Sequence, residues 1–479
     1  MTGYKHGAYT HELPTSIVPP VVSMAGLTVV VGTAPIHLLD NPTEAVQKAQ
    51  LAYTYSEAVK KMGYNDDFDK YTICEAISSH FALFAVAPLV MINVLDPEKH
   101  KAKDNETVKI TKGEGVLKAE GVLKATVVVK SENGETTYKN TEEETLYELE
   151  FDDDGKLHIY TEVEETIKVE FERLDASLVT AEDVVGGVRL DGSYKGLELV
   201  NTVFPRFREV PGILIAPKFS TNPLVAAVLK AKANNINGLF QAVTFVDVPT
   251  SEVKDYTQVP EYKNMKNLDD PNVFVFWPKC SIGGIQYHKS TQAASLANLV
   301  DAQNEGYPYH EPSNNNLQMD AAVLEDGTEI LLGLEQANYL NGQGIVTSLN
   351  FIGGWKLWGH RTSCYPGNTD PKDSFISVRR VFIYEQNQFI LTYFQKVDKP
   401  GNRKLIDNII DSKNIDLNGK AARQFILGGR VEFLEEENPL TDLMDGIYKF
   451  HIFLTPASPA RELRGLFELD PNYYNTLFQ

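Results

Sequence analysis

The run Leu27-Thr-Val-Val-Val-Gly32 decides the fold class of this chain. A short apolar run that is rich in β-branched residues and ends at glycine is typical of a buried strand. Leu89-Val-Met-Ile-Asn-Val-Leu95 has the same character. Between these two strands we expect helices over residues 41–55, 56–63 and 71–84. Strand, helix and strand in this order predict an α/β unit with parallel strands over residues 25–96.

The same alternation returns in the second half of the chain. We expect strands over residues 212–216, 242–248 and 273–277, and helices over residues 223–233 and 290–303. These spacings predict a layered α/β domain over residues 190–365.

A different composition separates the two α/β segments. Residues 101–180 hold 11 basic and 20 acidic residues, a net charge of −9, with many β-branched side chains. Asn133-Gly134 and Asp154-Gly155 are typical of hairpin turns between alternating strands. We therefore predict an inserted, acidic, β-rich domain over residues 97–185.

The C-terminal part mixes both element types. Over residues 370–460 we expect a strand at Ser377 to Tyr384, a helix at Arg403 to Ser412 and a strand at Tyr448 to Leu454. Residues 461–479 follow two prolines and predict an extended strand arm, in which the apolar residues are Leu463, Leu466, Phe467 and Leu469. The predicted fold class is thus multidomain α/β (α+β).

The N-terminal segment, residues 1–24, predicts a second extended arm. Pro14 and Pro19-Pro20 prevent a helix and favour an extended path. The segment is nevertheless richer in large apolar side chains than a disordered tail, and these are Tyr4, Tyr9, Leu13, Ile17 and Val18. Such a segment needs a surface to pack on, either on its own domain or on another copy of the chain.

Bulk composition narrows the function classes. The 479 residues include 45 basic and 65 acidic residues, so the net charge of −20 makes the chain a poor nucleic-acid binder. Three distant cysteines indicate a reducing compartment without disulfides. We see no secretory signal and no apolar run long enough to span a bilayer, and expect a soluble protein of the cytoplasm.

Motifs for catalysis are absent from the sequence. It has no P-loop, no HExxH, no CxxC and no G-x-S-x-G elbow, so we expect no enzyme activity, cofactor or metal. His360 to Thr362 beside Cys364 suggests either a thiol site or a packed turn, and Asp152 to Gly155 either a partial calcium loop or a hairpin turn. Two alternative functions remain: an α/β hydrolase-like enzyme, or a surface- or carbohydrate-binding module on the insertion.

One local basic stretch stands out in this acidic chain. Residues 379–430 contain ten basic and five acidic residues. They form either an ordinary solvated face or a docking face for an acidic partner. The candidate docking residues are Lys399, Arg403, Lys404, Lys420 and Arg423.

Two segments carry a resemblance to a known family. The N-terminal arm with the following AGLTVVVGTAPIHL, residues 25–38, resembles the start of contractile tail sheath proteins of phages and phage-tail-like particles. Residues 338–345, NYLNGQGI, and 354–362, GWKLWGHRT, resemble the family's most specific signature, with Asn341, Gly344, Trp358, Gly359, Arg361 and Thr362. The resemblance covers residues 1–95 and 190–479 but not the insertion.

The resemblance implies a structural, non-enzymatic role. Sheath subunits stack as hexameric rings around a tail tube and contract to drive the tube through a target envelope. Terminal arms of neighbouring subunits complete a β-sheet in a C-terminal domain near the tube. Partners would be other copies, the tube, baseplate and tail terminator proteins, without nucleic acid or membrane contact.

This role leads to further expectations about the chain's parts. The basic stretch would face the tube and the insertion would face outward. Met24 to Gly26 and Thr455 to Arg461 would act as flexible connections. Assembly would take place in the bacterial host cytoplasm, and the product would be a virion tail, a bacteriocin or another injection device.

Overall fold

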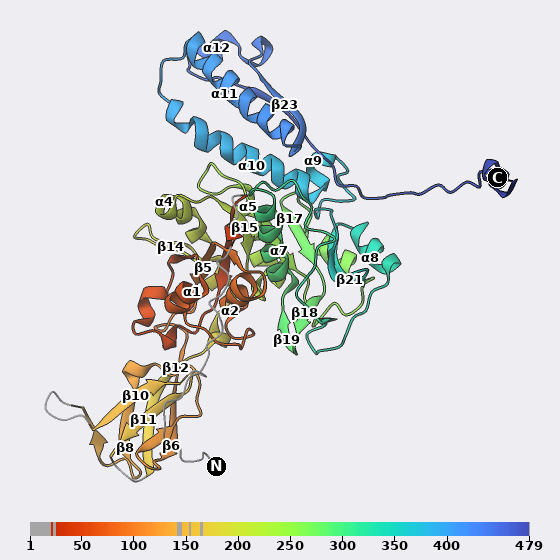
Figure 1. Ribbon diagram of the computed structural model, residues 1–479. Coiled ribbons are helices and arrows are strands. Elements are labelled where there is room, and N and C mark those ends of the chain that lie inside the picture. Colours follow the sequence, from red (N-terminus) through yellow and green to blue (C-terminus); the bar gives the residue numbers. More distant parts are fainter. Residues whose placement is uncertain (1–20, 23–24, 141–145, 153–154, 163–165, 479) are drawn as a thin grey trace, which may run out of the picture.

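A central eight-stranded sheet organises the molecule (Figure 1). The computed structural model describes residues 21–22, 25–140, 146–152, 155–162 and 166–478. In spatial order the sheet contains β22 (Gly354–Trp358), β21 (Ile345–Phe351), β17 (Val273–Phe276), β16 (Val243–Asp247), β15 (Pro211–Ile215), β2 (Leu27–Gly32), β5 (Leu89–Asn93) and β3 (Ala49–Ala52).

The sheet combines the two predicted α/β segments. Strand β2 pairs in parallel with β5 on one side and with β15 on the other. The inner six strands are all parallel, and β3 and β22 pair antiparallel at the two edges. Residues 25–96 and 190–365 therefore share one sheet, and the predicted α/β fold class is confirmed.

Alternate side chains of the strands reach two separate cores. Val30 of β2 packs with Ile73 of α2 (Thr72–Ile77) and Ala297 of α7 (Lys289–Gln303) on one face. Val31 packs on the other face with Leu229 of α5 (Pro223–Asn234). This period of two is what a strand buried on both faces requires, and it explains the continuous apolar run.

One predicted helix of the first segment is wrong. Residues 41–55 contain only the short 3-10 turn η2 (Pro42–Ala45) and then the edge strand β3, which pairs antiparallel with β5. Pairing to the sheet edge thus overrides the local helical pattern. The next helix, α1 (Tyr55–Met62), is confirmed, because Thr54 caps its first turn and Gly63 ends it at φ +74°.

Smaller elements complete the core. Helix α2 continues into a π-helical turn, η3 (Ser78–Leu83). The remaining helices are α3 (Ala181–Val185), α4 (Val203–Phe207), α6 (Val259–Met265) and α8 (Leu334–Asn341), and the remaining strands are β1 (Val21–Val22), β4 (Val86–Ala87), β13 (Gly187–Val188), β14 (Tyr194–Lys195), β18 (Lys279–Ile282), β19 (Ile285–Tyr287) and β20 (Ala321–Val323).

The predicted β-rich insertion is a separate lobe at the far end of the molecule (Figure 1). One sheet contains β6 (Lys101–Lys109), β12 (Thr166–Leu174), β8 (Val128–Ser131) and β9 (Thr137–Tyr138), and the other β10 (Tyr147–Phe151), β11 (Leu157–Thr161) and β7 (Glu114–Val116). The two sheets enclose their own apolar core. Asn133-Gly134 forms the expected turn, whereas residue 154 of the second expected turn lies outside the described residues.

The C-terminal domain is built from two long helices and a β-ribbon (Figure 1). Its elements are α9 (Pro371–Ser374), α10 (Ile376–Tyr393), α11 (Arg403–Ala422), β23 (Ile426–Glu432), α12 (Leu440–Met444) and β24 (His451–Pro456). The predicted strand over 377–384 is wrong, because these residues lie inside α10. Val378 and Val381 are buried three residues apart, as on one face of a helix. In a short apolar run, the periodicity of the sequence alone does not distinguish a helix from a strand.

Two kinds of feature are missing from the described residues. No described helix combines the length and apolar character needed to cross a membrane. In the same residues, no group of three His, Cys, Asp or Glu side chains is arranged to hold a metal ion.

Candidate functional site: the C-terminal arm and the joint that carries it

The β23–β24 ribbon presents open strand edges. The two strands pair antiparallel with each other, from Ile426 opposite Pro456 to Glu432 opposite His451. No third strand pairs with them among the described residues. Leu417 of α11 packs with Ile426 and Val431 of β23 on the ribbon's inner face. The ribbon is therefore supported on one face and free to accept a strand at its edges.

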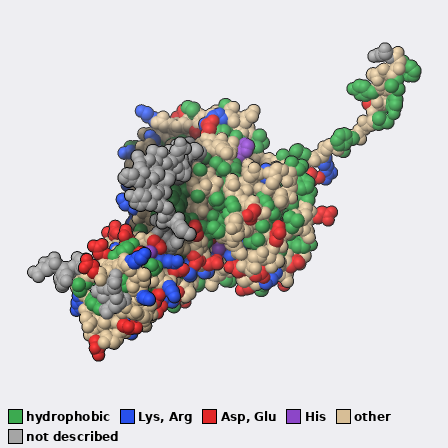
Figure 2. All heavy atoms as spheres, turned by 60° about the horizontal axis from the view of Figure 1, so that its bottom comes forward, with side chains coloured by type: hydrophobic (Ala, Val, Ile, Leu, Met, Phe, Trp, Pro, Cys, Tyr) green, Lys and Arg blue, Asp and Glu red, His purple; other side chains and the backbone are tan. Residues whose placement is uncertain are grey.

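The chain then leaves the body as a long arm, and Figure 2 shows its apolar atoms standing clear of the surface. Leu463, Leu466, Phe467 and Leu469 are 75% to 101% exposed. The strand predicted in the arm over residues 461–479 is absent among the described residues of this single chain, since a strand needs a hydrogen-bonded neighbour. The arm ends in a short 3-10 helix, η10 (Pro471–Phe478), whose large apolar side chains are exposed as well.

The N-terminal arm can be followed only at its base. The predicted arm residues Tyr4, Tyr9, Leu13, Ile17 and Val18 lie outside the described residues. Val21 and Val22 form β1, which pairs in parallel with β4 of the same chain. The surface on which the rest of the arm packs stays a prediction.

The signature residues meet at the joint between the core and the C-terminal domain. Gly344 has φ +70°, and a Cβ there would lie 2.6 Å from the carbonyl oxygens of Thr362 and Tyr365. Gly359 has φ +147°, and its Cβ would lie 2.9 Å from Cα of Val346. Both positions therefore require glycine, because the backbones touch and φ is positive.

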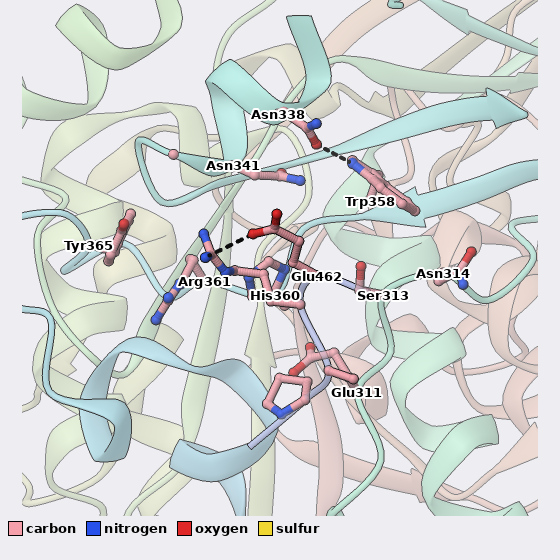
Figure 3. A pocket seen from close by; sticks show the side chains of 14 residues that line it. Glu311, Ser313, Asn314, Asn338, Asn341, Trp358, His360, Arg361, Tyr365 and Glu462 are labelled. Atoms are coloured by element: carbon pink, nitrogen blue, oxygen red, sulfur yellow. Dashed lines mark hydrogen bonds and ion pairs between the residues drawn. The ribbon is translucent and has the colours of Figure 1, made fainter. Parts of the chain in front are cut away.

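Two further signature residues, Arg361 and Thr362, bind the segment that leads into α10. Arg361 donates from Nη1 to Ser374 Oγ at 2.7 Å, and its guanidinium lies over the rings of Tyr365 and Phe375 at 4.4 and 3.8 Å. Thr362 Oγ1 donates to the carbonyl of Asp373 at 2.7 Å. Trp358 Nε1 donates to Asn338 Oδ1 at 3.2 Å, and Asn341 is buried beside it (Figure 3).

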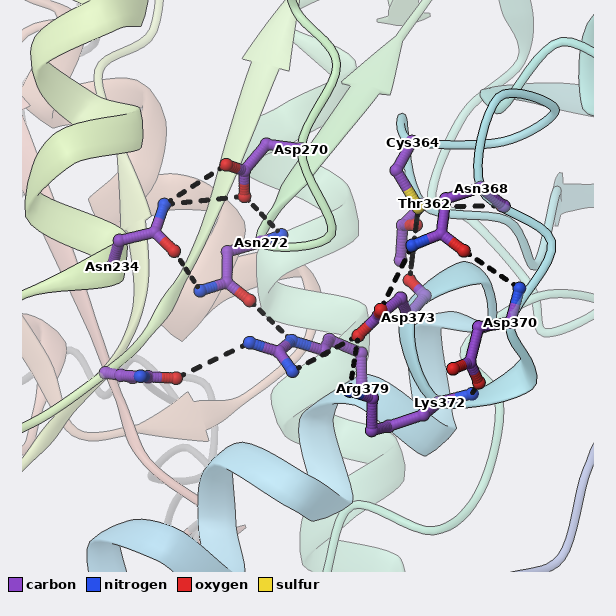
Figure 4. Close-up of polar contacts among 11 residues, drawn as sticks. Asn234, Asp270, Asn272, Thr362, Cys364, Asn368, Asp370, Lys372, Asp373 and Arg379 are labelled. Carbon is purple, nitrogen blue, oxygen red and sulfur yellow. Dashed lines mark hydrogen bonds and ion pairs between the residues drawn. The ribbon is translucent and has the colours of Figure 1, made fainter.

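Two arginines then lock α10 onto the core. Arg379 donates from Nε to Asn272 Oδ1 at 2.7 Å, and its Nη1 lies 3.5 Å from Asp373 (Figure 4). Arg380 forms a buried bidentate ion pair with Asp301 of α7. Charge counting had placed both arginines in the exposed basic stretch, because the sequence does not reveal a buried partner in a distant segment.

The predicted basic face is smaller than expected. Lys399, Arg403 and Lys404 are exposed. Arg423 is half-exposed and pairs with Glu305 at 2.9 Å. Lys420 is buried and its ammonium lies 2.6 Å from the carboxylate of Glu385, so in this structure it does not belong to an exposed docking face.

The thiol beside the signature is not activated. Burial raises the pKa of Cys364, and its Sγ lies 3.1 Å from Thr362 Oγ1. A catalytic cysteine needs the opposite shift, toward the thiolate. Burial, with help from the charges of Arg361 and Arg461, also lowers the pKa of His360 to about 4. The geometry therefore favours the packed turn over a thiol site.

Comparison with known proteins connects this architecture to one family. No protein-family model matches the sequence. The tail sheath protein of Burkholderia phage BcepMu is 26% identical over 496 residues, which cover 99% of this chain and 98% of the relative. The chain is similar to phage tail sheath proteins along nearly its whole length. The tail sheath protein of Escherichia phage P2 is 25% identical over 305 residues, 59% of this chain and 69% of the relative.

Solved structures share the fold of this chain over nearly its whole length. A chain of the anti-feeding prophage baseplate matches with a TM-score of 0.60 at 13% identity, covering 98% of this chain and 100% of that one. A chain of the contracted PVC sheath, an extracellular contractile injection system, matches with a TM-score of 0.56 at 13% identity, covering 99% of each. The predicted resemblance to contractile sheath subunits is confirmed.

Proposed function

We propose that this sheath subunit polymerises with its own copies as stacked hexameric rings around a tail tube, and that the polymer shortens to drive the tube through a cell envelope. One observation carries the proposal. The extended part of the C-terminal arm carries four large exposed apolar residues, and among the described residues no third strand pairs with the ribbon from which the arm departs. An arm without a partner surface on its own body is suited to reach a neighbour.

Strand addition would connect the copies. The arm's backbone would pair with a ribbon edge of the next subunit, and its alternate side chains would pack on that subunit's surface. Such an exchange joins different surfaces head to tail, which generates rings or helical arrays instead of closed dimers. The N-terminal arm would make a second connection of the same kind.

Contraction would then move rigid bodies joined by flexible strands. The buried Arg380–Asp301 pair and the signature hydrogen bonds hold the core and the C-terminal domain together. Thr455 and Pro456 of the predicted connection belong to β24, so only residues 457–461 lie outside any helix or strand, and these would absorb the reorientation. The extended lattice would relax cooperatively to one with more contact between subunits.

Further partners are proposed from proteins of the same fold. One of the matching chains belongs to a baseplate and another to a contracted sheath, so we propose baseplate and tail terminator proteins as end partners. The subunit would act structurally, without catalysis or cofactor, in a virion tail or a phage-tail-like particle assembled in the bacterial host cytoplasm. The insertion would face outward.

Microscopy of the purified chain tests this function. At increasing protein concentration, light scattering should rise and negative-stain images should show long hollow cylinders. A monodisperse monomer at every concentration, with or without a tube, would contradict the proposal and favour a binding module or enzyme.

Tube docking can be tested separately by charge reversal. Changing Lys399, Arg403 and Lys404 to glutamate should weaken sheath assembly on tubes about tenfold or more, because opposite charge steers and registers docking. Tube-free polymers should form normally. The matched control changes the exposed Lys103, Lys109 and Lys118 of the insertion to glutamate, which alters net charge equally. Equal effects of the two triple variants, by cosedimentation with tubes, would refute a tube-facing basic surface.

A further inference from the structure

The two outer edges of the β23–β24 ribbon are not equivalent. The amide of Val431 in β23 donates to Asn414 Oδ1 of α11 at 2.9 Å, and the Val431 carbonyl accepts from Asn414 Nδ2 at 3.4 Å. In an antiparallel pair, a residue directs both of its backbone groups either toward the partner strand or away from it. The groups of Val431 therefore point away from β24, and Asn414 occupies the outer edge of β23 at this point.

The outer edge of β24 has no such cover among the described residues. Val431 lies opposite Ile452, and Gly429 lies opposite Leu454, so Ile452 and Leu454 also direct their backbone groups outward. No backbone group of another described segment hydrogen-bonds to them. A strand that joins the ribbon therefore finds unpaired groups along β24 and a blocked position on β23.

The open edge of β24 sets the direction of an added arm. β24 begins at His451 and ends at Pro456, after which the chain's own arm leaves the body. An arm that pairs antiparallel with β24, as β23 does, runs from the Pro456 end to the His451 end. As a strand, residues 463–469 span about 23 Å, against about 20 Å for β24. The added strand therefore ends at the His451 end of the ribbon, which the chain reaches from α12.

The short helix η10 follows this segment almost at once, since only Asp470 separates the two. Tyr474 and Leu477 lie three residues apart, which is one turn of a 3-10 helix, so they share a face. Four large side chains of η10 are 59% to 89% exposed, and these are Tyr473, Tyr474, Leu477 and Phe478. The arm thus presents an apolar face directly beyond its strand segment.

Helix α12 presents apolar side chains at the far end of the C-terminal domain from the arm (Figure 1). Leu440 and Met444 lie about one helical turn apart and are 77% and 87% exposed. After α12, Gly446 has φ +79°, and the Ile447 amide donates to the Asp442 carbonyl at 2.8 Å. This helix ending keeps Ile447, which is 44% exposed, next to the last turn. Exposed apolar side chains grouped in this way indicate an interaction site.

We infer that Leu440 and Met444 of α12 form a docking surface for η10 of a second copy. The neighbour's arm is then held twice, by backbone pairing along β24 and by packing of Tyr474 and Leu477 on α12. The second contact also fixes the register of the added strand, because a slip along β24 would carry η10 off α12. The chain's own arm points away from its α12 (Figure 1). This inference rests on the proposed self-assembly through the arm.

Serine substitutions on either side test the contact. Tyr474→Ser with Leu477→Ser, and separately Leu440→Ser with Met444→Ser, should each raise the protein concentration needed for polymer formation at least about tenfold, because large apolar side chains lose their buried contact. All four substitutions together should raise this concentration no further than about the larger of the two effects, since both pairs remove the same contact. The melting temperature of the monomer should stay that of the parent, because the four side chains are exposed.

A matched control removes two exposed leucines outside the C-terminal domain. Leu190 and Leu331 are 111% and 68% exposed. Leu190→Ser with Leu331→Ser should change the concentration needed for polymer formation less than about twofold. An equal effect of this control and the η10 variant, or fully additive effects of the η10 and α12 variants, would overturn the inference.

Disulfide trapping identifies the occupant directly. The three native cysteines are buried, so copies with Met444→Cys can be mixed with copies with Leu477→Cys. Oxidation of the mixed polymers should give a linked pair of copies that neither variant forms alone. No linked pair in the mixture, a disulfide only within a chain that carries both substitutions, or normal polymers from a chain that lacks residues 471–479 would each overturn the inference and leave the proposed function standing. Failure of the parent chain to polymerise would instead count against the proposed function.

Discussion

Changing Leu463, Phe467 and Leu469 together to serine is expected to abolish polymer formation while the monomer stays folded. In a strand these three residues point to one side, whereas Arg464, Leu466 and Glu468 point to the other. Burial of each large apolar side chain contributes about 1.5–3 kcal/mol, and tenfold in affinity corresponds to about 1.4 kcal/mol. The concentration needed for assembly should therefore rise by at least about 100-fold, measured by sedimentation and electron microscopy.

The same arm supplies the control for this experiment. Arg464→Ser with Glu468→Ser alters the opposite side of the same segment and keeps the net charge, so polymers should form at nearly the parental concentration. Circular dichroism should be unchanged in all variants, because the arm is exposed along its length. If the triple serine variant polymerises like the parent, the arm is not the connecting strand.

Glu385→Ala should lower the stability of the C-terminal domain, because it removes the centre of a buried ion-pair network. The Glu385 carboxylate accepts ion pairs from Lys413 and Lys420, both at 2.6 Å, and a hydrogen bond from the Tyr307 hydroxyl at 2.9 Å. Removing it leaves two buried ammonium groups with only the half-buried carboxylate of Asp416. Loss of one partner of a buried ion pair costs about 3–5 kcal/mol.

Hydrogen exchange measures this cost locally. Amides of α11 should lose protection by several orders of magnitude in Glu385→Ala, while those of β2 and β5 in the core sheet should change little. Asp407→Ala removes an exposed ion pair of the same helix, with Arg403, and should cost at most about 0.5 kcal/mol. Equal loss of protection in both variants would show that the buried network does not stabilise the packing of α10 on α11.

Local sequence patterns predicted the inner strands of the sheet and most of the helices beside it, but they did not predict the edge strand β3. The sequences of β2, β5, β16 and β17 are mainly apolar and rich in β-branched residues. This composition is typical of strands that are buried on both faces, so these strands could be recognised in the sequence. Strand β3 and the first half of α10 are short segments in which apolar and polar residues are mixed. Their structure depends on contacts with segments that are distant in the sequence, such as the pairing of β3 with β5. The C-terminal strand arm was predicted from its apolar residues after two prolines, but a single chain offers no partner for the backbone of that strand.

The candidate site was predicted only as a set of positions. The signature residues do converge, yet their partners Ser374 and Asp373, and the neighbouring Glu311, come from other segments that no spacing rule connects. Lys420 was assigned to the surface from a count of charges. Such a count does not reveal that Lys420 on α11 contacts Glu385 on α10, which lies 35 residues earlier in the sequence.

The way in which the insertion joins the core has a consequence for how such particles diversify. Its first and last strands pair directly, with Lys101 opposite Leu174, and the amide of Asp175 donates to the carbonyl of His100 at 3.0 Å. Entry and exit are adjacent, and beside this strand pair the lobe contacts the core through the Lys70–Glu120 ion pair and the ring contact of His37 with Phe151. Another domain with adjacent ends could replace it without disturbing the sheet or the arms. The lobe can therefore be exchanged without changing the strand order of the core sheet.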